Sequence, residues 1–261
     1  MSNISTLAYV HPNAELGENV TVEPFAYIDD NVTIGEGTII MSNATVKSGS
    51  RIGKNCRIFP GAAIGGIPQD LKFRGEDTVA IVGDNTTVRE CATVNRGTAS
   101  KGKTVVGSNC LLMAYSHIAH DSILGNSIIV GNATQLAGEV EVDDFAILSG
   151  GTLVHQFTRI GKHVMIQGGT RLGKDIPPFI IAGREPVCYS GVNLIGLRRH
   201  NFSNEKINEI QEIYRLIFQS GYNFTDAIAK IEVTFERTPE MELIVDFVKD
   251  SPRGIVRGYM G

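Results

Sequence analysis

VGSNCLLMAYSHIAHDSILGNSIIV, residues 106–130, returns to an aliphatic residue at every sixth position, with Gly, Asn, Ser and Asp frequent in between. A period of six fits neither the 3.6-residue turn of an α-helix nor the simple alternation of a strand. It is typical of a parallel β-helix built from hexapeptide repeats. The same register extends over most of the chain, through Val10, Leu16, Val22, Ile28, Ile34, Ile40, Val46, Ile52, Ile58, Ile64, Val82, Val88, Val94, Val106, Leu112, Ile118, Leu124, Val130, Leu136, Val142, Leu148, Val154, Ile160, Ile166 and Leu172.

Each hexad is expected to form a short strand and a corner, with the aliphatic residue pointing inward. A small residue often follows four positions later and should point inward as well, as at Ala14, Ala26, Ala44, Ser50, Cys56 and Ala62. We therefore predict that Cys56 and Cys110 are core residues. One coil cannot bury its apolar face alone, so the stability must come from stacking.

The bulk composition, 42% hydrophobic and 20% charged residues over 261 positions, is that of an ordinary globular protein. The start, MSNISTLAYV, has no basic segment followed by an apolar one, so we expect no secretory signal. No apolar run reaches the length of a membrane span. We therefore expect a cytoplasmic protein with reduced cysteines. Because no two cysteines form a CxxC pair, a cysteine zinc site is not expected.

Basic residues gather between positions 159 and 199, a stretch that contains seven Lys or Arg and only two acidic residues, Asp175 and Glu185. This stretch is either a solvated basic face or a docking surface for an anionic partner. Its aromatic residues are not interleaved as nucleic-acid binding would require, so we expect no nucleic-acid partner.

The register indicates a β-helix over residues 1–190 with two excursions, at about 65–81 and 96–105. Loops inserted into a solenoid often gather on one face and bind ligands. KDIPPF at 174–179 marks a boundary, after which the period becomes helical. Ser203 should cap one helix that ends near residue 220, a second should run from about Asp226 to Phe235, and Thr238-Pro239 should open a third. These three helices predict a C-terminal α-helical domain at 191–261.

The hexads resemble the left-handed parallel β-helix of the hexapeptide acyltransferase superfamily. The resemblance implies a mainly β fold whose triangular coils hold three hexads, or 18 residues, each. His120 follows the inward Ile118 by two residues, and Gly138 and Gln156 follow at intervals of 18. The three should therefore line up on one outer face. A histidine can act as a general base, and a glycine N–H can stabilise an oxyanion. The alternative is an ordinary surface histidine.

Six motifs narrow the resemblance: QDLKF (69–73), SHIAHDS (116–122), GNATQLAG (131–138), HQF (155–157), DIPPF (175–179) and GVNLIGLRRHNFS (191–203). In this order they resemble the acyl-carrier-protein–UDP-N-acetylglucosamine O-acyltransferases, which begin the synthesis of lipid A, the anchor of lipopolysaccharide. The resemblance implies a homotrimer with its cleft between subunits. It also implies that no metal or cofactor takes part, because the acyl group arrives on the phosphopantetheine of acyl carrier protein.

Residue roles follow from the resemblance position by position. His120 would remove the proton of the sugar 3-hydroxyl, Asp121 would orient its imidazole, and the Gly138 N–H would bind the thioester oxyanion. Neighbours on an extended strand point apart, so register alone does not place Asp121 beside His120. The substrate-binding residues implied are Gln69, Asp70 and Lys72 for the sugar nucleotide, His117, His155 and Gln156 along the cleft, and Asn193 and Arg199 for the nucleotide or the phosphopantetheine.

The resemblance also implies that the residue at position 168, here Gly168, limits the length of the acyl chain that the groove accepts. This position lies 48 residues beyond His120, which is about 13 Å along a solenoid with the usual strand spacing. A glycine would leave the groove open, so we predict a 3-hydroxyacyl chain of about 14 carbons or more. The alternative is a plain corner glycine. Glu139, Ile195 and His200 depart from the family pattern, which has a histidine, an acidic residue and an arginine there.

Three other functions stay open. One is acyl transfer to the nitrogen of a UDP-amino sugar. The N-acyltransferases of this kind carry a separate N-terminal domain, whereas the hexads here start at Val10. Another is a zinc-dependent hexapeptide carbonic anhydrase using His117, His120 and His155, although these occupy different positions within their hexads. The third is a non-catalytic scaffold.

Overall fold

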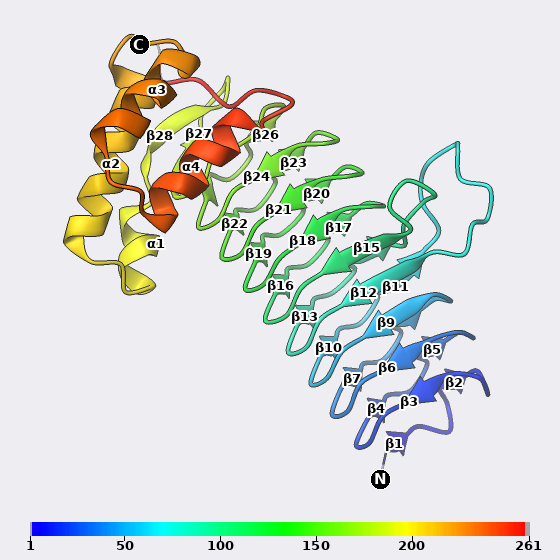
Figure 1. Ribbon diagram of the computed structural model, residues 1–261. Helices are drawn as coiled ribbons and strands as arrows, with labels where there is room; N and C mark the ends of the chain where they lie inside the picture. The colour runs from blue at the N-terminus through cyan, green and yellow to red at the C-terminus, as the bar shows by residue number, and fades with distance from the viewer. Residues whose placement is uncertain (1, 259–261) are drawn as a thin grey trace.

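Residues 2–258 are described by the computed structural model, in which a long solenoid carries a group of helices at one end (Figure 1). The solenoid is a left-handed parallel β-helix, as predicted. Its strands pair with every third strand along the chain, which sorts them into three sheets that form the sides of the coils. The repeat predicted this arrangement because three hexads complete one coil.

The first sheet has eleven strands: β1 (Asn3–Ile4), β4 (Thr21–Val22), β7 (Ile39–Ile40), β10 (Arg57–Ile58), β13 (Thr87–Val88), β16 (Leu111–Leu112), β19 (Ile129–Val130), β22 (Ile147–Leu148), β25 (Met165–Ile166), β27 (Ile180–Gly183) and β28 (Cys188–Val192). The second has nine: β2 (Tyr9–Val10), β5 (Tyr27–Ile28), β8 (Thr45–Val46), β11 (Ala63–Gly66), β14 (Thr93–Asn95), β17 (His117–Ile118), β20 (Gln135–Leu136), β23 (Leu153–Val154) and β26 (Arg171–Leu172). The third has eight: β3 (Glu15–Leu16), β6 (Thr33–Ile34), β9 (Ser50–Ile52), β12 (Val79–Val82), β15 (Lys103–Val106), β18 (Ile123–Leu124), β21 (Glu141–Val142) and β24 (Arg159–Ile160).

The inward hexad residues form one continuous core, as the repeat predicted. Cys56 and Cys110 are buried within it, and burial raises the pKa of both thiols. Asparagine is frequent at the corners, for example at Asn55 and Asn109, which have φ of 53° and 58°. Asparagine tolerates this left-handed conformation better than most residues, so it suits a chain that must turn every six residues.

The solenoid begins one hexad before Val10, the first position counted in the register, and within the predicted range of 1–190. Strand β1 pairs Ile4 with Val22, so the ladder starts before Val10. Ile4 lies six residues before Val10 and is 44% exposed because no further coil covers this end.

Both excursions leave the solenoid on the same side (Figure 1). The first loop spans residues 67–78 and the second residues 96–102, since β12 and β15 begin earlier than predicted. A ladder pair joins Ile64 to Val94, so the first loop lengthens its coil by two hexads. Another joins Val82 to Val106, so the second loop lengthens its coil by one hexad. Whole hexads leave the six-residue register unchanged, which is why the aliphatic positions stayed in phase across both loops.

The helical end follows an antiparallel pair, β27 and β28, that the period did not predict. It contains α1 (Leu194–Arg199), α2 (Asn204–Gln219), α3 (Phe224–Thr234) and α4 (Pro239–Lys249). Ser203 caps α2 and Thr238 caps α4, as predicted, whereas α1 was not predicted. The division placed between residues 190 and 191 falls inside β28, and two separate domains stay a prediction.

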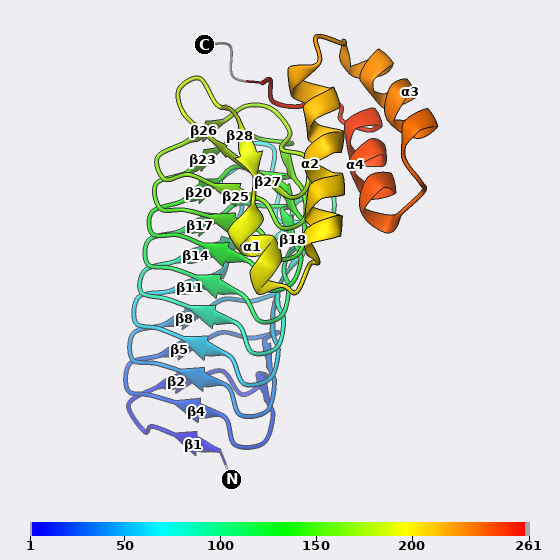
Figure 2. The ribbon, with the colours of Figure 1, turned by 90° about the vertical axis from the view of Figure 1, so that its left-hand side faces the viewer.

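Helix α2 packs lengthwise against the last strands of the solenoid (Figure 2). Tyr214 is fully buried there and donates a hydrogen bond to the carbonyl of Pro178 at 2.5 Å, and its ring stacks near Tyr189 and Phe218. In the part of the chain that the structure describes, no helix combines the length and the apolarity needed to cross a membrane.

Candidate active site

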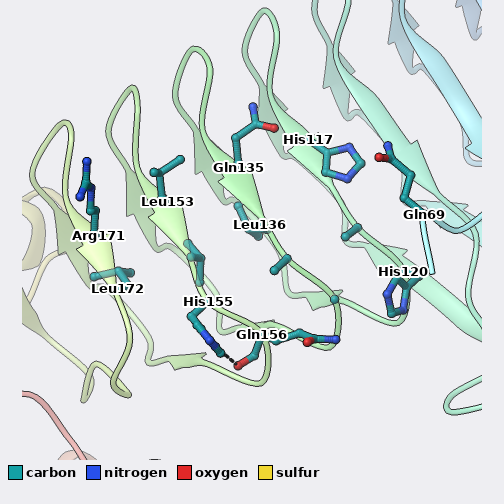
Figure 3. A pocket seen from close by; sticks show the side chains of 14 residues that line it. Gln69, His117, His120, Gln135, Leu136, Leu153, His155, Gln156, Arg171 and Leu172 are labelled. Atoms are coloured by element: carbon teal, nitrogen blue, oxygen red, sulfur yellow. Dashed lines mark hydrogen bonds between the residues drawn. The ribbon is translucent and has the colours of Figure 1, made fainter. Parts of the chain in front are cut away.

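A groove of about 570 Å³ crosses the outer face of β17, β20, β23 and β26 (Figure 3). His120 and Gln69 lie at one end of it and Arg171 at the other. The residues that line it are Gln69, His117, Ala119, His120, Gln135, Leu136, Ala137, Gly138, Leu153, Val154, His155, Gln156, Arg171 and Leu172. His120, Gly138 and Gln156 therefore share one groove, as their spacing of 18 predicted.

His120 is only 7% exposed, and each of its ring nitrogens faces a carboxylate. Nδ1 lies 2.8 Å from Oδ2 of Asp121, and Nε2 lies 3.9 Å from Oδ2 of Asp70. Asp121 has a φ of 60°, so it belongs to a corner rather than to an extended strand. This turn brings two consecutive side chains together, which the alternation of a strand would have kept apart.

Asp121 is completely buried and is held by the loop of residues 96–102. Its carboxylate accepts hydrogen bonds from the N–H of Thr98 (2.9 Å), the hydroxyl of Thr98 (2.6 Å) and the N–H of Lys101 (3.1 Å). Burial by itself raises the pKa of Asp121, but the hydrogen bonds from Thr98, His120 and Lys101 together outweigh it and lower the pKa. An ionised carboxylate only accepts, so it holds the proton on Nδ1 of His120 and leaves the Nε2 lone pair free.

Gly138 lies one coil away, directly against the imidazole. A Cβ built on it would stand 2.5 Å from Cε1 and 2.6 Å from Nε2 of His120, so no larger residue fits without moving the ring. The N–H of Glu139 bonds to the carbonyl of His120 at 3.0 Å and sets the spacing of the two coils. Across residues 2–258, no hydrogen-bond acceptor is found for the N–H of Gly138. This N–H can therefore donate to a ligand placed beside the base.

His117 and His155 form the polar walls of the groove. Nδ1 of His117 lies 2.7 Å from the hydroxyl of Thr93, and its pKa is lowered by burial and then by the charge of His120. Nδ1 of His155 donates to the carbonyl of Gln156 at 3.0 Å, since a carbonyl can only accept. His117 is thus a neutral hydrogen-bonding group near neutral pH, and both rings are oriented by these hydrogen bonds.

The loop of residues 67–78 closes the His120 end of the groove. Gln69 lines the groove, and the Asp70 carboxylate approaches His120. Asp70 also accepts a hydrogen bond from the N–H of Lys72 at 2.8 Å, which fixes the turn. The Lys72 side chain is exposed and stands outside the groove lining.

Besides Lys72, the predicted site residues Gly168, Asn193 and Arg199 lie away from this groove in a single chain. Gly168 follows β25 in the eleven-stranded sheet, whereas His120 follows β17 in the nine-stranded sheet, so they occupy different corners. Counting 13 Å along one groove was therefore wrong for one chain. Asn193 is buried as the cap of α1, where it accepts from the N–H of Gly196 and donates to the carbonyl of His163. Arg199 is exposed at the end of the same helix.

The zinc hypothesis finds no geometric support. His117 and His120 belong to one coil and His155 to another two coils on. All three Nδ1 atoms already have partners, which are Thr93, Asp121 and the carbonyl of Gln156. Within residues 2–258, no three His, Cys, Asp or Glu side chains are grouped as a metal site requires.

Two family models match the chain. One, for domain 2 of UDP N-acetylglucosamine O-acyltransferase, covers residues 175–256, and one for six bacterial transferase hexapeptide repeats covers residues 31–66. The acyl-[acyl-carrier-protein]–UDP-N-acetylglucosamine O-acyltransferase of Alkalilimnicola ehrlichii is 50% identical over 98% of this chain and 100% of its own length. That of Ectopseudomonas mendocina is 46% identical with the same coverage. The chain belongs to this O-acyltransferase family.

Solved structures agree with this membership of the O-acyltransferase family. The UDP-N-acetylglucosamine acyltransferase of Bacteroides fragilis is 58% identical and superposes with a TM-score of 0.96, covering 97% of this chain and 99% of that one. The Arabidopsis enzyme is 30% identical with a TM-score of 0.86, covering 97% and 100%. The predicted resemblance is thus confirmed, and the protein is an acyltransferase.

The three positions that depart from the family pattern have distinct surroundings. Glu139 occupies a corner with φ of 59°, directly after Gly138. Ile195 is exposed on α1, whereas His200 ends that helix and packs its ring against Phe145 and His163. His200 therefore supports the contact between α1 and the solenoid, a role that the motif alone did not reveal. Sequence reasoning also missed Thr98, although the second excursion was a signal for it.

Proposed function

We propose that this acyltransferase moves a 3-hydroxyacyl chain from acyl carrier protein to the 3-hydroxyl of UDP-N-acetylglucosamine, the first step of lipid A biosynthesis. One observation carries the proposal. A histidine whose second nitrogen is held by a buried carboxylate lies against a glycine whose N–H has no acceptor among the described residues. A base and an oxyanion donor are thus adjacent, as acyl transfer requires.

The chemical steps follow from this geometry. Nε2 of His120 takes the proton from the sugar 3-hydroxyl, whose oxygen attacks the carbonyl carbon of the thioester. The carbonyl oxygen becomes an oxyanion, which the N–H of Gly138 stabilises. The C–S bond then breaks, and the imidazolium returns its proton to the leaving thiolate. Asp121, ionised at neutral pH, stabilises the imidazolium in between.

The groove residues suit the two substrates. Gln69 and Asp70 would position the sugar, with Lys72 near the nucleotide phosphates, while His117, His155 and Gln156 would orient the reacting groups. No resident cofactor is needed because the acyl group arrives already activated as a thioester. We place the reaction in the cytoplasm, since nucleotide sugars and acyl carrier protein are found there.

A homotrimer would complete the site. The outward positions of the eleven-stranded sheet carry an aliphatic row of Leu111, Ile129, Ile147 and Met165. Packing this row of one subunit beside the groove of the next would remove apolar surface from water. It would also bring the neighbouring Gly168 toward His120, so that Gly168 could limit the acyl chain, and α1 with Asn193 and Arg199 toward the substrates.

The test is acyl transfer from 3-hydroxyacyl carrier proteins of several lengths to UDP-N-acetylglucosamine, measured in chelator. We expect wild type to prefer chains of about 14 carbons or more and His120→Ala to lose about 10³-fold or more in kcat. Activity that survives this substitution would refute the base assignment. If wild type acylates only a UDP-3-amino sugar, transfer to nitrogen replaces the proposal, and the same base and oxyanion site would serve it.

A further inference from the structure

The far end of the groove carries a positive charge. Ladder pairs link His117 to Gln135, Gln135 to Leu153, and Leu153 to Arg171, so these outward side chains form one row along the groove. Figure 3 shows Arg171 at the end opposite to His120. Three strand spacings separate His117 from Arg171, which amounts to about 14 Å.

Arg171 has fewer partners than other arginines on the solenoid strands and corners. Arg57 and Arg96, whose side chains also lack hydrogen bonds among the described residues, at least lie over the rings of Phe59 and Phe73. Arg51 bonds to Asn31, Arg89 to Glu90, and Arg159 to the carbonyl of Asp250. Arg171 is exposed, and no hydrogen bond or ion pair of its side chain is found within residues 2–258. The groove lining also contains no Asp or Glu. The Asp70 carboxylate stands at the opposite end of the groove, beside His120, so the guanidinium at this end has no ion-pair partner among the described residues and attracts an anion.

We infer that Arg171 binds the phosphate on the prosthetic arm of the acyl donor and makes the enzyme select phosphorylated donors. The inference rests on the proposed function, which places the thioester at His120. A phosphopantetheine arm is about as long as an extended peptide of four to five residues, or about 15 Å from sulfur to phosphorus. That length matches the separation of the reacting end from Arg171. A guanidinium binds phosphate through two parallel hydrogen bonds.

The nucleotide diphosphate fits this position less well. It is attached to the same sugar ring as the reacting hydroxyl, so its first phosphate stays within about half of that distance from the base. It is expected instead near the loop of residues 67–78, where Lys72 lies.

The middle of the groove has the mixed polarity of such an arm. The side-chain amide of Gln135 donates to the carbonyl of Tyr115 at 3.0 Å, which leaves its oxygen as an acceptor for an amide N–H of the arm. Ala137 and Leu153 offer apolar surface beside it. A hydrocarbon tail in this place would satisfy neither Gln135 nor Arg171, and desolvating an unpaired guanidinium is costly.

The test compares two donors with the same acyl chain, 3-hydroxyacyl-phosphopantetheine and 3-hydroxyacyl-pantetheine, at saturating UDP-N-acetylglucosamine. Wild type should favour the phosphorylated donor by about tenfold in kcat/KM, and Arg171→Met should reduce this ratio to about one. Arg171→Lys keeps the charge without the paired hydrogen bonds and should give an intermediate ratio. Arg237→Met, at an exposed arginine between α3 and α4, removes the same charge elsewhere and should keep the wild-type ratio.

An unchanged ratio in Arg171→Met, or a wild type that does not discriminate, would overturn the inference. So would a change confined to the KM of UDP-N-acetylglucosamine, which would assign Arg171 to the nucleotide, or to acyl-length preference, which would assign this groove to the acyl chain. Failure of the proposed function looks different, because wild type would then transfer nothing from the carrier protein to UDP-N-acetylglucosamine.

Discussion

Two buried histidines at corners of the same solenoid have opposite surroundings. His120 is 7% exposed and has the carboxylate of Asp121 on Nδ1. His163 is 4% exposed and is stacked on the ring of Phe145 at 4.7 Å, with Phe202 against its edge. Burial, then the charges of His200 and Lys162, lower the pKa of His163 to about 4. A histidine buried among rings and positive charges is thus a neutral packing group, whereas His120 has beside it the carboxylate that can stabilise its charged form.

The repeat does not create this difference. Both corners come from the same hexad backbone, and Asp121 and His163 have φ values of 60° and 56°. What covers each corner differs. The loop of residues 96–102 brings hydrogen-bond donors to Asp121, whereas the segment joining α1 to α2 brings Phe202 and His200 to His163. Segments outside the repeat therefore decide which corner performs chemistry.

Asp121→Asn would remove the difference between the two corners most directly. An asparagine amide cannot stabilise the imidazolium, and it can present a donor to Nδ1, which favours the wrong tautomer. We expect kcat for transfer from the carrier protein to fall on the order of 10³-fold. The melting temperature serves as the control, since Thr98 can still bond to the amide oxygen. A loss of less than fivefold in a folded variant would show that His120 works without Asp121.

Gly138→Ala tests whether the base needs its glycine neighbour. The new Cβ would overlap Cε1 and Nε2 of His120, whose ring is anchored by Asp121 and cannot simply swing away. We expect a loss of about 10² in kcat with little change in the KM of the donor. Gly173→Ala, at a glycine with open space around the new Cβ and, like Gly138, no left-handed φ, is the matched control. Equal losses in both variants would contradict a specific role for Gly138.

Thr98→Val weakens the support of the carboxylate without touching the base. It removes the hydroxyl that donates to Asp121 and keeps the backbone N–H. Losing a hydrogen bond to the ionised form raises the pKa of Asp121, so the acid limb of the kcat profile should move to higher pH. We expect about a tenfold loss of kcat at neutral pH. An unchanged pH profile would mean that the N–H groups of the loop suffice.

His163→Phe should affect acid stability rather than catalysis. His163 has a native pKa of about 4 against an ordinary 6.5, so the unfolded chain binds its proton first as the pH falls. Its contribution is intact above pH 6.5 and is lost progressively toward pH 4, by about 3 kcal/mol in total. In urea unfolding between pH 7 and pH 4, the free energy of unfolding should fall less steeply in the variant than in wild type. The kcat of the variant at pH 7.5 should stay within twofold of wild type. If the free energy of unfolding fell equally with pH in the variant and in wild type, the lowered pKa of His163 would be contradicted.

Much of the site could be predicted from the period. His120, Gly138 and Gln156 are separated by whole coils without an intervening loop, so residue counting alone aligned them in the groove. Counting failed for Gly168 because it measured height along the axis and ignored which side of the triangle a hexad occupies. It also left Asp121 open, since a strand pattern does not report the left-handed corner that turns its side chain back toward His120.

A hexad is a local, repeated signal, and so the sequence by itself determined the solenoid, its inward residues and its stacked neighbours. The paths of the two loops and of the helices follow no period. Only the tertiary structure decided that Thr98 reaches across 23 residues to the Asp121 carboxylate, that Asp70 faces His120, and that His163 is enclosed by rings. These contacts depend on how irregular segments fold back on the coils, because distance along the chain does not limit which side chains meet.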